Sequence, residues 1–320
     1  MEYVRCNLCG ADHYNIVGRK GRYNIPVINV ICKNCGLVYV NPRFDKKEHK
    51  KYYSSDKYKK IYFKVNQPTE DLLEWSMKRA KKNYDFFDTN INFKRLKKKV
   101  KKILDIGCSD GAMLYYFKNK GWQVSGIEPS AEFAKYGKVK YGLDIKNEVF
   151  EEIKYPKNYF DLISLVHTLE HVRNPEKTLK KSRELLNKDG FIYIEVPNIY
   201  RPEQSIKYFF QDAHLYSFSP TTITSLLNKV GLEIIKINNE NRNLRIFTIK
   251  GRKKEIIKEN YKDVARFLKM HNIKYYLTAL FLFFFLIRSF SKTILIMFGH
   301  EKGKKILKRL NNIKNKLKKI

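Results

Sequence analysis

The residues best suited to chemistry lie in the stretch 103–111, ILDIGCSDG, where an acid and two glycines follow a short apolar run. The pattern predicts a strand that enters a tight turn, where glycine lets the backbone approach a ligand closely. Glu128 ends the next predicted strand, 23 residues after Asp105, and a carboxylate there can accept hydrogen bonds from two ribose hydroxyls. Together these features predict a site for an adenosine-type cofactor.

The charges in this turn distinguish two kinds of cofactor. The spacing is D-x-G-x-x-x-G, with Asp105 before the first glycine and Asp110 inside the loop, and it differs from the GxGxxG of nicotinamide sites. Carboxylates repel a pyrophosphate but attract the amino group of a methionine moiety. This argument from the sign of the charges selects S-adenosylmethionine.

A protein that uses this cofactor to methylate a hydroxyl must also remove the proton of that hydroxyl. Methyl transfer is an in-line displacement at a sulfonium, so the protein aligns the acceptor and deprotonates it if it is a hydroxyl. Histidine ionises near neutral pH and is the natural base. Among the seven histidines, His214 is the first choice of base and His171 the second, and Tyr216 is a further catalytic candidate.

His167, Glu170 and His171 follow the predicted strand 160–167 at positions i, i+3 and i+4. On a helix this spacing places three metal-type ligands on one face, where a divalent ion could acidify an acceptor hydroxyl. The alternative is that Glu170 and His171 only cap and orient the helix that begins before NPEKTL.

Four cysteines near the start of the chain form two CxxC pairs, Cys6 with Cys9 and Cys32 with Cys35. A glycine follows each pair, which suits a tight turn whose N–H groups face the thiolates. Four thiolates match a closed, structural Zn²⁺ site. We expect a zinc ribbon over 1–45 that needs its metal to fold. A redox CxxC is the alternative, but it would not need a second copy with the same glycine.

The elements that must position these residues begin at Lys101. Short apolar segments alternate with helical ones, which indicates a parallel sheet covered on both faces, with ligands at the carboxyl ends of its strands. The expected strands are 101–108, 122–130, 160–167, 190–197 and 243–252, and the expected helices are 111–121, 131–142 and 176–190.

Residues 46–100 are expected to form a helical linker or lid. An apolar stripe recurs there at helical spacing, made of Leu72, Leu73, Trp75, Ala80, Tyr84 and Phe87. We favour packing of this stripe against the neighbouring domain. The alternative is a lid over a substrate pocket, carrying Tyr52 and Tyr53.

The motifs ILDIGCSDG, IEPS, FDLISLVHTLEHVRNP and HLYSFSPTTITSLLNKVGLEI together resemble those of class I S-adenosylmethionine-dependent methyltransferases. The cysteine pairs and CKNCGLVYVNPRF resemble a bacterial subgroup that modifies sugars or polysaccharide precursors. The resemblance covers about residues 1–250. It implies an α/β fold with a Rossmann-like seven-stranded sheet over 101–250, beside the zinc ribbon. Ser109 stands where the family often has a third glycine, and a serine can still donate its N–H.

The family pattern also implies a set of cofactor-binding residues. The aspartate and glycines of the turn would surround the methionine part, Glu128 would hold the ribose, and the two residues after it would lie beside the adenosine. Glu148 or Val149 would be near the adenine, and Cys108 would be a small loop residue and not a nucleophile. The full set is Asp105, Gly107, Cys108, Gly111, Glu128, Pro129, Ser130, Glu148 and His167.

The tail, residues 251–320, departs from the family core. From Arg252 on it holds 19 Lys and Arg against 4 Asp and Glu, or +15 of the chain's net charge of +33. The apolar run 275–287 is shorter than the ~20 residues that span a bilayer. Residues 306–320 repeat Ile and Leu at helical spacing among lysines, which is typical of helices on anionic lipid. We expect peripheral or monotopic attachment through 275–320; the alternative is a buried helical pair in a dimer.

The sequence favours an enzyme that methylates a hydroxyl or carbon of a sugar, glycolipid or related small molecule. No secretory signal opens the chain, so we expect reduced cysteines and a place at the inner face of the cytoplasmic membrane. A nucleic-acid methyltransferase is a second interpretation, prompted by the zinc and the charge. It is disfavoured because VHTLEH stands where an [N/D]PP[Y/F] tetrapeptide would be expected. A non-catalytic scaffold is a third, and the intact cofactor motif argues against it.

Overall fold

The computed structural model describes residues 1–91, 93–96, 100–255 and 261–289, together with 301, 305 and 308. The chain divides into two compact units, Met1–Arg266 and Phe267–Ile320. All the candidate catalytic, cofactor and cysteine residues belong to the first unit. The four-part domain division expected from the sequence stays a prediction.

A seven-stranded sheet forms the centre of the first unit, with the order β10-β11-β8-β7-β4-β5-β6. Strands β4 to β8 run parallel, while β11 is antiparallel to both β8 and β10. This arrangement confirms the predicted fold class. The strands are β4 (Lys102–Ile106), β5 (Gln123–Ile127), β6 (Ile145–Lys146), β7 (Phe160–Val166), β8 (Leu186–Pro197), β10 (Leu232–Asn238) and β11 (Asn243–Lys250).

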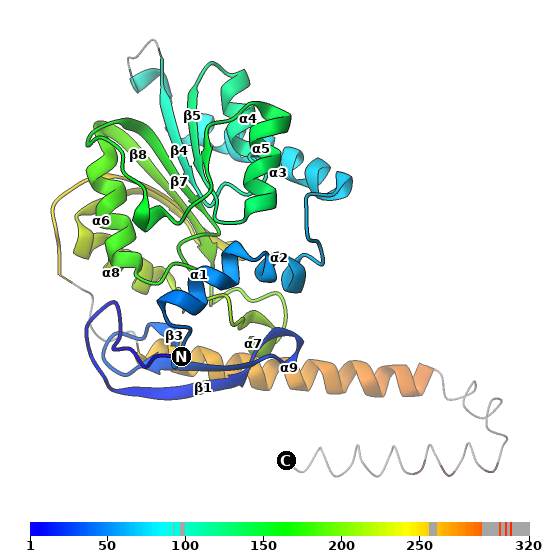
Figure 1. Cartoon of the computed structure of the whole chain (residues 1–320). Helices are drawn as coiled ribbons and strands as arrows, with labels where there is room; N and C mark the ends of the chain where they lie inside the picture. Colours follow the sequence, from blue (N-terminus) through cyan, green and yellow to red (C-terminus); the bar gives the residue numbers. More distant parts are fainter. Residues whose placement is uncertain are drawn as a thin grey trace. The chain divides into compact units, whose positions relative to one another are not determined.

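Helices cover both faces of this sheet, as Figure 1 shows. One face carries α3 (Glu70–Ile91), α4 (Ala112–Asn119) and α5 (Ala131–Tyr141), and the other carries α6 (Pro175–Leu185) and α8 (Pro220–Val230). Two hydrophobic clusters correspond to the two faces, with Phe87 and Phe117 in one and Leu179 and Leu227 in the other. Because both faces are buried, the parallel strands are almost continuously apolar.

The chain order of the strands creates a switch point beside β4. From β4 the chain moves outward through β5 to β6, then returns to β7 on the other side of β4. Parallel α/β sheets bind ligands outside the carboxyl ends of the strands at such a point. The turns that follow Ile106, Ile127 and Val166 therefore meet at one edge.

The N-terminal ribbon is joined to the main domain by a shared sheet. Its strands β1 (Tyr14–Lys20), β2 (Pro26–Cys32) and β3 (Val38–Val40) form a four-stranded sheet with β9 (Tyr216–Ser217). Strand β9 pairs antiparallel with β3 and follows β8 in the chain. A short 3-10 turn, η1 (Arg22–Asn24), connects β1 and β2.

The predicted linker is helical but serves two structural roles. Helix α3 packs on α4 through its apolar stripe, in which Ala80 and Phe87 are buried while Trp75 is 49% exposed. Helices α1 (Lys46–Ser54) and α2 (Lys57–Tyr62) instead lie at the carboxyl ends of the central strands. The remaining short elements are η2 (Phe93–Leu96), η3 (Phe150–Glu152) and α7 (Ile206–Phe209).

Two local predictions were wrong. The helix expected over 176–190 ends at Leu185, and 186–190 instead opens β8, because Leu186 pairs with Phe160 of β7. His167 to His171 form a turn and no helix, since His167 has a φ of +51°. The next helix, α6, is capped by the side chain of Asn174 on the backbone of Lys177 at 2.9 Å, so Glu170 and His171 do not cap it.

Helix α9 (Tyr261–Ser289) is one continuous helix that includes the apolar run 275–287. Within the residues that the structure describes, no helix combines the length and apolarity needed to cross a membrane. The segment 290–300 and the basic repeat 306–320, apart from residue 308, lie outside the described residues.

Candidate active site

The turn after β4 has the close approach that its glycines predict. Gly107 and Gly111 have φ values of +78° and +79°, a backbone region that side chains other than glycine rarely occupy. A Cβ atom on Gly107 would lie 2.4 Å from Oγ1 of Thr168, and one on Gly111 would lie 2.5 Å from Cδ1 of Leu143. The turn is therefore restricted to glycine by both conformation and space.

Glu128 joins the turn after β4 to the turn after β5. Its carboxylate accepts the backbone N–H of Ser109 at 2.9 Å and that of Ser130 at 2.9 Å. The side chain is buried. A buried acid held by two loop amides is fixed in position at the edge of the sheet, where it can also accept hydroxyl groups of a ligand.

Of the two aspartates, Asp105 precedes the glycine turn and Asp110 lies inside it, and both are buried. Oδ1 of Asp105 accepts the hydroxyl of Ser164 at 2.7 Å, and burial raises the pKa of Asp105 to about 7. Asp110 accepts the backbone N–H of Ala112 and the hydroxyl of Ser76 of α3. The glycine turn thus carries a concentration of acid groups, as the sequence predicts.

Helix α2 contacts this turn from outside. The ammonium of Lys59 donates to the hydroxyl of Ser109 at 2.8 Å and lies 4.1 Å from the ring centre of Phe133. Asp56, which precedes the same helix, accepts the hydroxyl of Ser130. Lys59 is only 9% exposed. The N-terminal helices therefore cover the loops that the sequence assigns to the cofactor.

His171 and His214 lie together beside these loops, with ring centres 4.8 Å apart. Nδ1 of His171 donates to the carbonyl of Ala213 at 2.9 Å, and the hydroxyl of Tyr53 donates to the same carbonyl at 3.0 Å. Burial lowers the pKa of His171, and it lowers the pKa of His214 well below its usual range. Both rings are therefore neutral near pH 7.

His167 takes part in a different network. Its Nδ1 lies 3.2 Å from Glu170 and its Nε2 lies 3.2 Å from Glu195, which also accepts the side-chain amide of Asn243. Burial opposes a charge on this ring, but the two glutamates outweigh it and raise the pKa of His167. We interpret His167 as a cation that bridges two buried acids at the end of β7.

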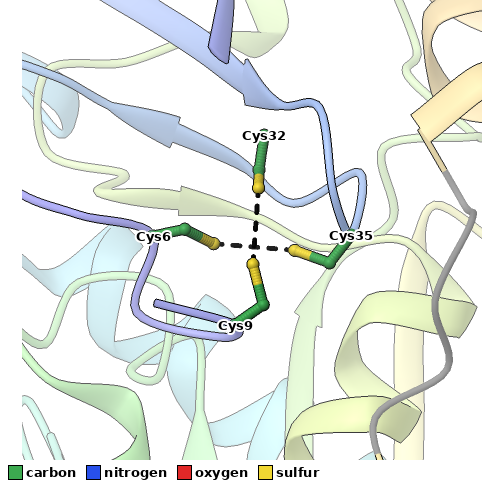
Figure 2. Close-up of side chains that lie close together, drawn as sticks. All are labelled: Cys6, Cys9, Cys32 and Cys35. Carbon is green, nitrogen blue, oxygen red and sulfur yellow. Dashed lines mark hydrogen bonds between the residues drawn. The ribbon is translucent and has the colours of Figure 1, made fainter. Parts of the chain in front are cut away.

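The four ribbon cysteines converge, as Figure 2 shows. Sγ of Cys6 lies 3.6 Å from Sγ of Cys35, and Sγ of Cys9 lies 3.5 Å from Sγ of Cys32. Four sulfurs about 2.3 Å from a central Zn²⁺ are separated by roughly 3.8 Å in a tetrahedron. The glycines after each pair, Gly10 and Gly36, both have positive φ, so the two knuckles have matching turns. The donor set and its spacing fit a structural zinc ion.

A family model described as a methyltransferase domain matches residues 77–237, half of the chain. The chain belongs to this family. The match runs from helix α3 to strand β10, so it includes the glycine turn, Glu128 and both histidines of the pair. The class I methyltransferase domain predicted from the motifs is therefore confirmed, while the sugar-modifying subgroup is not part of that result.

Curated relatives are similar over part of this domain. A ubiquinone biosynthesis O-methyltransferase of Yersinia enterocolitica is 30% identical over 105 residues, which are 31% of this chain and 43% of the relative. One of Azoarcus sp. is 23% identical over 155 residues, 43% of this chain and 66% of the relative. The chain thus spans less than two thirds of the length of either relative.

Solved structures are also similar to this chain. The crystal structure of an S-adenosylmethionine-dependent methyltransferase from Mesorhizobium loti is 13% identical. The similarity covers 46% of this chain and 89% of that one, with a TM-score of 0.41.

Three further residues that the sequence analysis assigned to the cofactor, Pro129, Glu148 and Cys108, lie in or beside the loops at the carboxyl ends of the strands. Pro129 and Glu128 offer backbone carbonyls to Asn147, which draws the loop after β6 toward them. Glu148 in that loop pairs with Lys50 of α1 at 3.1 Å. Cys108 is buried, and burial raises its pKa well above the usual range, which suits a small packing residue.

The side-chain hydroxyl of Tyr216 bonds to groups other than the histidine pair. Its hydroxyl bonds to Arg43 at 2.7 Å, Asn7 at 2.7 Å and the carbonyl of Arg173 at 2.9 Å, and the residue is 1% exposed. These partners include ribbon residues and the loop before α6. With every hydrogen-bonding direction occupied, Tyr216 is best placed to connect the ribbon to the methyltransferase domain.

Sequence reasoning missed the residues that support the site. Ser164 of β7 bonds to Asp105, and Glu195 of β8 contacts His167; both pairings follow from the register of neighbouring strands in the sheet. His49 of α1 contacts the carbonyl of His171 at 2.8 Å. The available signal was the tyrosines of 52–62, of which the lid alternative named Tyr52 and Tyr53, since each combines an apolar ring with a polar tip.

Proposed function

We propose that this protein transfers a methyl group from S-adenosylmethionine to a hydroxyl, or to a carbon, of a small-molecule acceptor. A sugar or glycolipid intermediate is the acceptor class we favour. One observation carries the proposal: buried Glu128 lies 2.9 Å from two loop amides, beside a glycine turn with two buried aspartates. That arrangement offers acceptors for ribose hydroxyls and negative charge for an ammonium group.

The residues present fit the methyl donor in shape and charge. Gly107 lets the turn pack directly against Thr168, where any Cβ would clash, and Asp105 and Asp110 are buried acids that can provide the negative charge a cationic ligand needs. When bound, S-adenosylmethionine supplies the methyl group on a positively charged sulfur, which leaves as a neutral thioether. The aspartates would hold the amino group and Glu128 the ribose.

His171 and His214 are the groups that would handle the acceptor's proton. Both side chains are buried and their rings are neutral near pH 7, so each presents a nitrogen lone pair to a proton or a cation. Burial lowers the pKa of both rings and so makes them weaker bases than an exposed histidine. Since a hydroxyl must lose its proton during methyl transfer, this pair favours an oxygen acceptor. The relatives are named as O-methyltransferases, which is consistent with this choice.

Tyrosines around the histidine pair support a carbohydrate-like acceptor. The ring of Tyr58 lies 5.1 Å from that of His171, and the hydroxyls of Tyr52 and Tyr62 both donate to Asp212. Aromatic faces combined with hydroxyl and carboxylate groups suit a ring with an apolar face and several hydroxyls. The resemblance of the zinc ribbon to that of sugar-modifying enzymes supports the same class.

We further propose that the four ribbon cysteines hold a structural Zn²⁺ and that the tail binds anionic lipid. In α9 the side chains of Met270, Tyr276 and Leu277 are 57%, 64% and 61% exposed. The surrounding tail carries a charge of +15 from Arg252 on. Apolar side chains within a basic segment favour the surface of a membrane with anionic headgroups. Sedimentation with phosphatidylglycerol vesicles, and not with phosphatidylcholine vesicles, is the expected result.

The function is tested with methyl-labelled S-adenosylmethionine and two acceptor panels, one of sugar nucleotides and glycolipids and one of phenols. We expect label to appear in the first panel and His214→Gln to abolish the transfer while the donor still binds. His13 is exposed and outside the site, so His13→Gln is the matched control. Label only in phenols would overturn the acceptor class, and absence of donor binding would overturn the function.

A further inference from the structure

We propose that Glu170, His171 and His214 bind a divalent transition-metal ion, separate from the metal of the cysteine cluster. The ion would hold and acidify the acceptor hydroxyl. What the ion does rests on the proposed function, whereas its binding does not. Each of the three residues offers one ligand atom, and these atoms lie within 4.8 Å of one another. A small adjustment of side chains would bring them to bonding distance of one ion.

The three ligands come from two segments that the backbone holds side by side. Glu170 and His171 lie in the turn after β7, and His214 lies in the loop before β9. The backbone N–H of Tyr216 donates to the carbonyl of Glu170 at 3.2 Å, which connects the two segments. The rings of His171 and His214 meet edge to face at 77°, so neither ring covers the other.

The hydrogen bonds of His171 leave its Nε2 unprotonated and therefore able to bind a metal ion. The carbonyl of Ala213 can only accept, so its 2.9 Å contact assigns the proton of His171 to Nδ1. The hydroxyl of Tyr53 lies 2.9 Å from the same nitrogen and, because it donates its own proton to the carbonyl of Ala213, accepts from Nδ1 as well. Nε2 then carries a bare lone pair, and it lies 3.9 Å from Oε1 of Glu170. Histidines that bind metals usually donate their other ring N–H to a backbone carbonyl in this way. The orientation of His171 is therefore already that of a ligand.

The buried carboxylate of Glu170 is the strongest evidence for a cation at this position. The residue is 0% exposed, and its Oε1 faces His167. Its other oxygen, Oε2, is buried and has no hydrogen-bond partner in the part of the chain that the structure describes. A buried carboxylate oxygen without a donor is costly and rare. A bound cation would satisfy this oxygen.

The donor set selects the kind of ion. Two imidazoles and one carboxylate suit Zn²⁺, Fe²⁺, Co²⁺ or Mn²⁺, while Mg²⁺ prefers oxygen ligands alone. Three protein ligands leave coordination positions open, which is the pattern of catalytic sites. The cysteine cluster, in contrast, would fill all four positions of a tetrahedral ion. The two centres therefore differ in ligands, in openness and in role.

An ion at this position would change how the acceptor loses its proton. A hydroxyl bound to a divalent ion becomes far more acidic, and its proton passes to solvent. The resulting oxygen would attack the methyl carbon of S-adenosylmethionine. The carbon–sulfur bond breaks, its electron pair stays on the sulfur, and a carbon–oxygen bond forms. His214 would then act as a ligand and not as a free base.

The sequence alone suggested His167 as a third ligand beside Glu170 and His171. In the structure both nitrogens of His167 are engaged, one with Glu170 and the other with Glu195. His214, which lies more than forty positions later in the chain, takes its place in the cluster. The proposed ligand set is therefore Glu170, His171 and His214.

The test is a titration of the intact zinc-loaded chain with Mn²⁺, followed by electron paramagnetic resonance with no methyl donor or acceptor present. We expect one saturable Mn²⁺ site, displaced by added Zn²⁺. Glu170→Gln and His214→Gln should each weaken Mn²⁺ binding at least tenfold, and His13→Gln should leave it unchanged. Circular dichroism and donor binding check that each variant folds, and His171→Gln serves if one of the others does not.

Absence of a saturable Mn²⁺ site in the intact chain would overturn this proposal. It would also be overturned if Glu170→Gln and His214→Gln bound Mn²⁺ as tightly as the His13→Gln control. The result also separates the two proposals. Mn²⁺ binding with no methyl transfer would support the metal site and count against the proposed function. Full methyl transfer in chelator-treated protein would support the function and overturn the role of the ion.

Discussion

The carboxylate of Glu128 lies 2.9 Å from the backbone nitrogen of Ser109, which joins the end of β5 to the glycine turn after β4. The two residues are 19 positions apart, and the parallel register of β4 and β5 places them at the same edge. The bond fixes an acid where a ribose would bind and orders the turn where a methionine moiety would bind. The proposed donor site depends on this pair.

Replacement of Glu128 by glutamine should weaken the binding of S-adenosylmethionine by roughly tenfold to a hundredfold. Hydrogen bonds to a charged group contribute about 1.5–3 kcal/mol, and glutamine loses the charge while keeping the shape. Isothermal titration calorimetry measures the change. Glu132 lies exposed in the first turn of α5, so Glu132→Gln is the matched control and should bind normally. Equal affinities in the two variants would contradict a ribose role for Glu128.

Binding of the donor should depend on pH through Asp105. Burial raises the pKa of this carboxyl to about 7, so below that pH it is mostly protonated and attracts an ammonium group poorly. The affinity should therefore fall as pH decreases below 7, by up to about tenfold per unit. Titrations between about pH 6 and 7.5 measure this. Asp105→Asn should bind weakly and lose the dependence, and a flat profile in the natural chain would disprove the assignment.

Gly107→Ala should destabilise the fold much more than Gly121→Ala. Both glycines have positive φ, which costs another residue about 1–2 kcal/mol. At Gly107 the new Cβ would also meet Thr168 at 2.4 Å, and this overpacking adds about 1–3 kcal/mol. At Gly121 no atom lies within 4 Å. Urea unfolding gives both free energies, and similar values for the two variants would show that space in the turn is not limiting.

Loss of the Zn²⁺ that we propose for the cysteine cluster should loosen the loop that carries His214. Strand β3 of the ribbon pairs with β9, and Tyr216 of β9 bonds to Asn7 between the first two cysteines. Cys32→Ser should therefore increase hydrogen exchange in residues 212–217 as well as in the ribbon. Cys108→Ser, at a cysteine outside the cluster, should retain the metal and the protection. Exchange confined to the ribbon would mean that the two parts are not coupled.

Periodicity predicted the parallel sheet and the positions of Asp105, Gly107, Gly111 and Glu128, because turns after buried strands have strong local signals. The end of α6 was missed because Leu186 joins β8 through pairing with Phe160, a contact that no local pattern records. The same holds for the third member of the metal-type cluster. His167 and His171 are close in sequence, but tertiary structure directs His167 to Glu195 and brings in His214.

The central claim is that buried acids around a tight glycine turn select a cationic sulfonium donor over a diphosphate. Titration calorimetry of the intact chain with S-adenosylmethionine and, separately, with NAD⁺ tests it most directly. We expect one saturable site for S-adenosylmethionine and no measurable heat of binding for NAD⁺. Binding of NAD⁺ with no binding of S-adenosylmethionine would contradict the account.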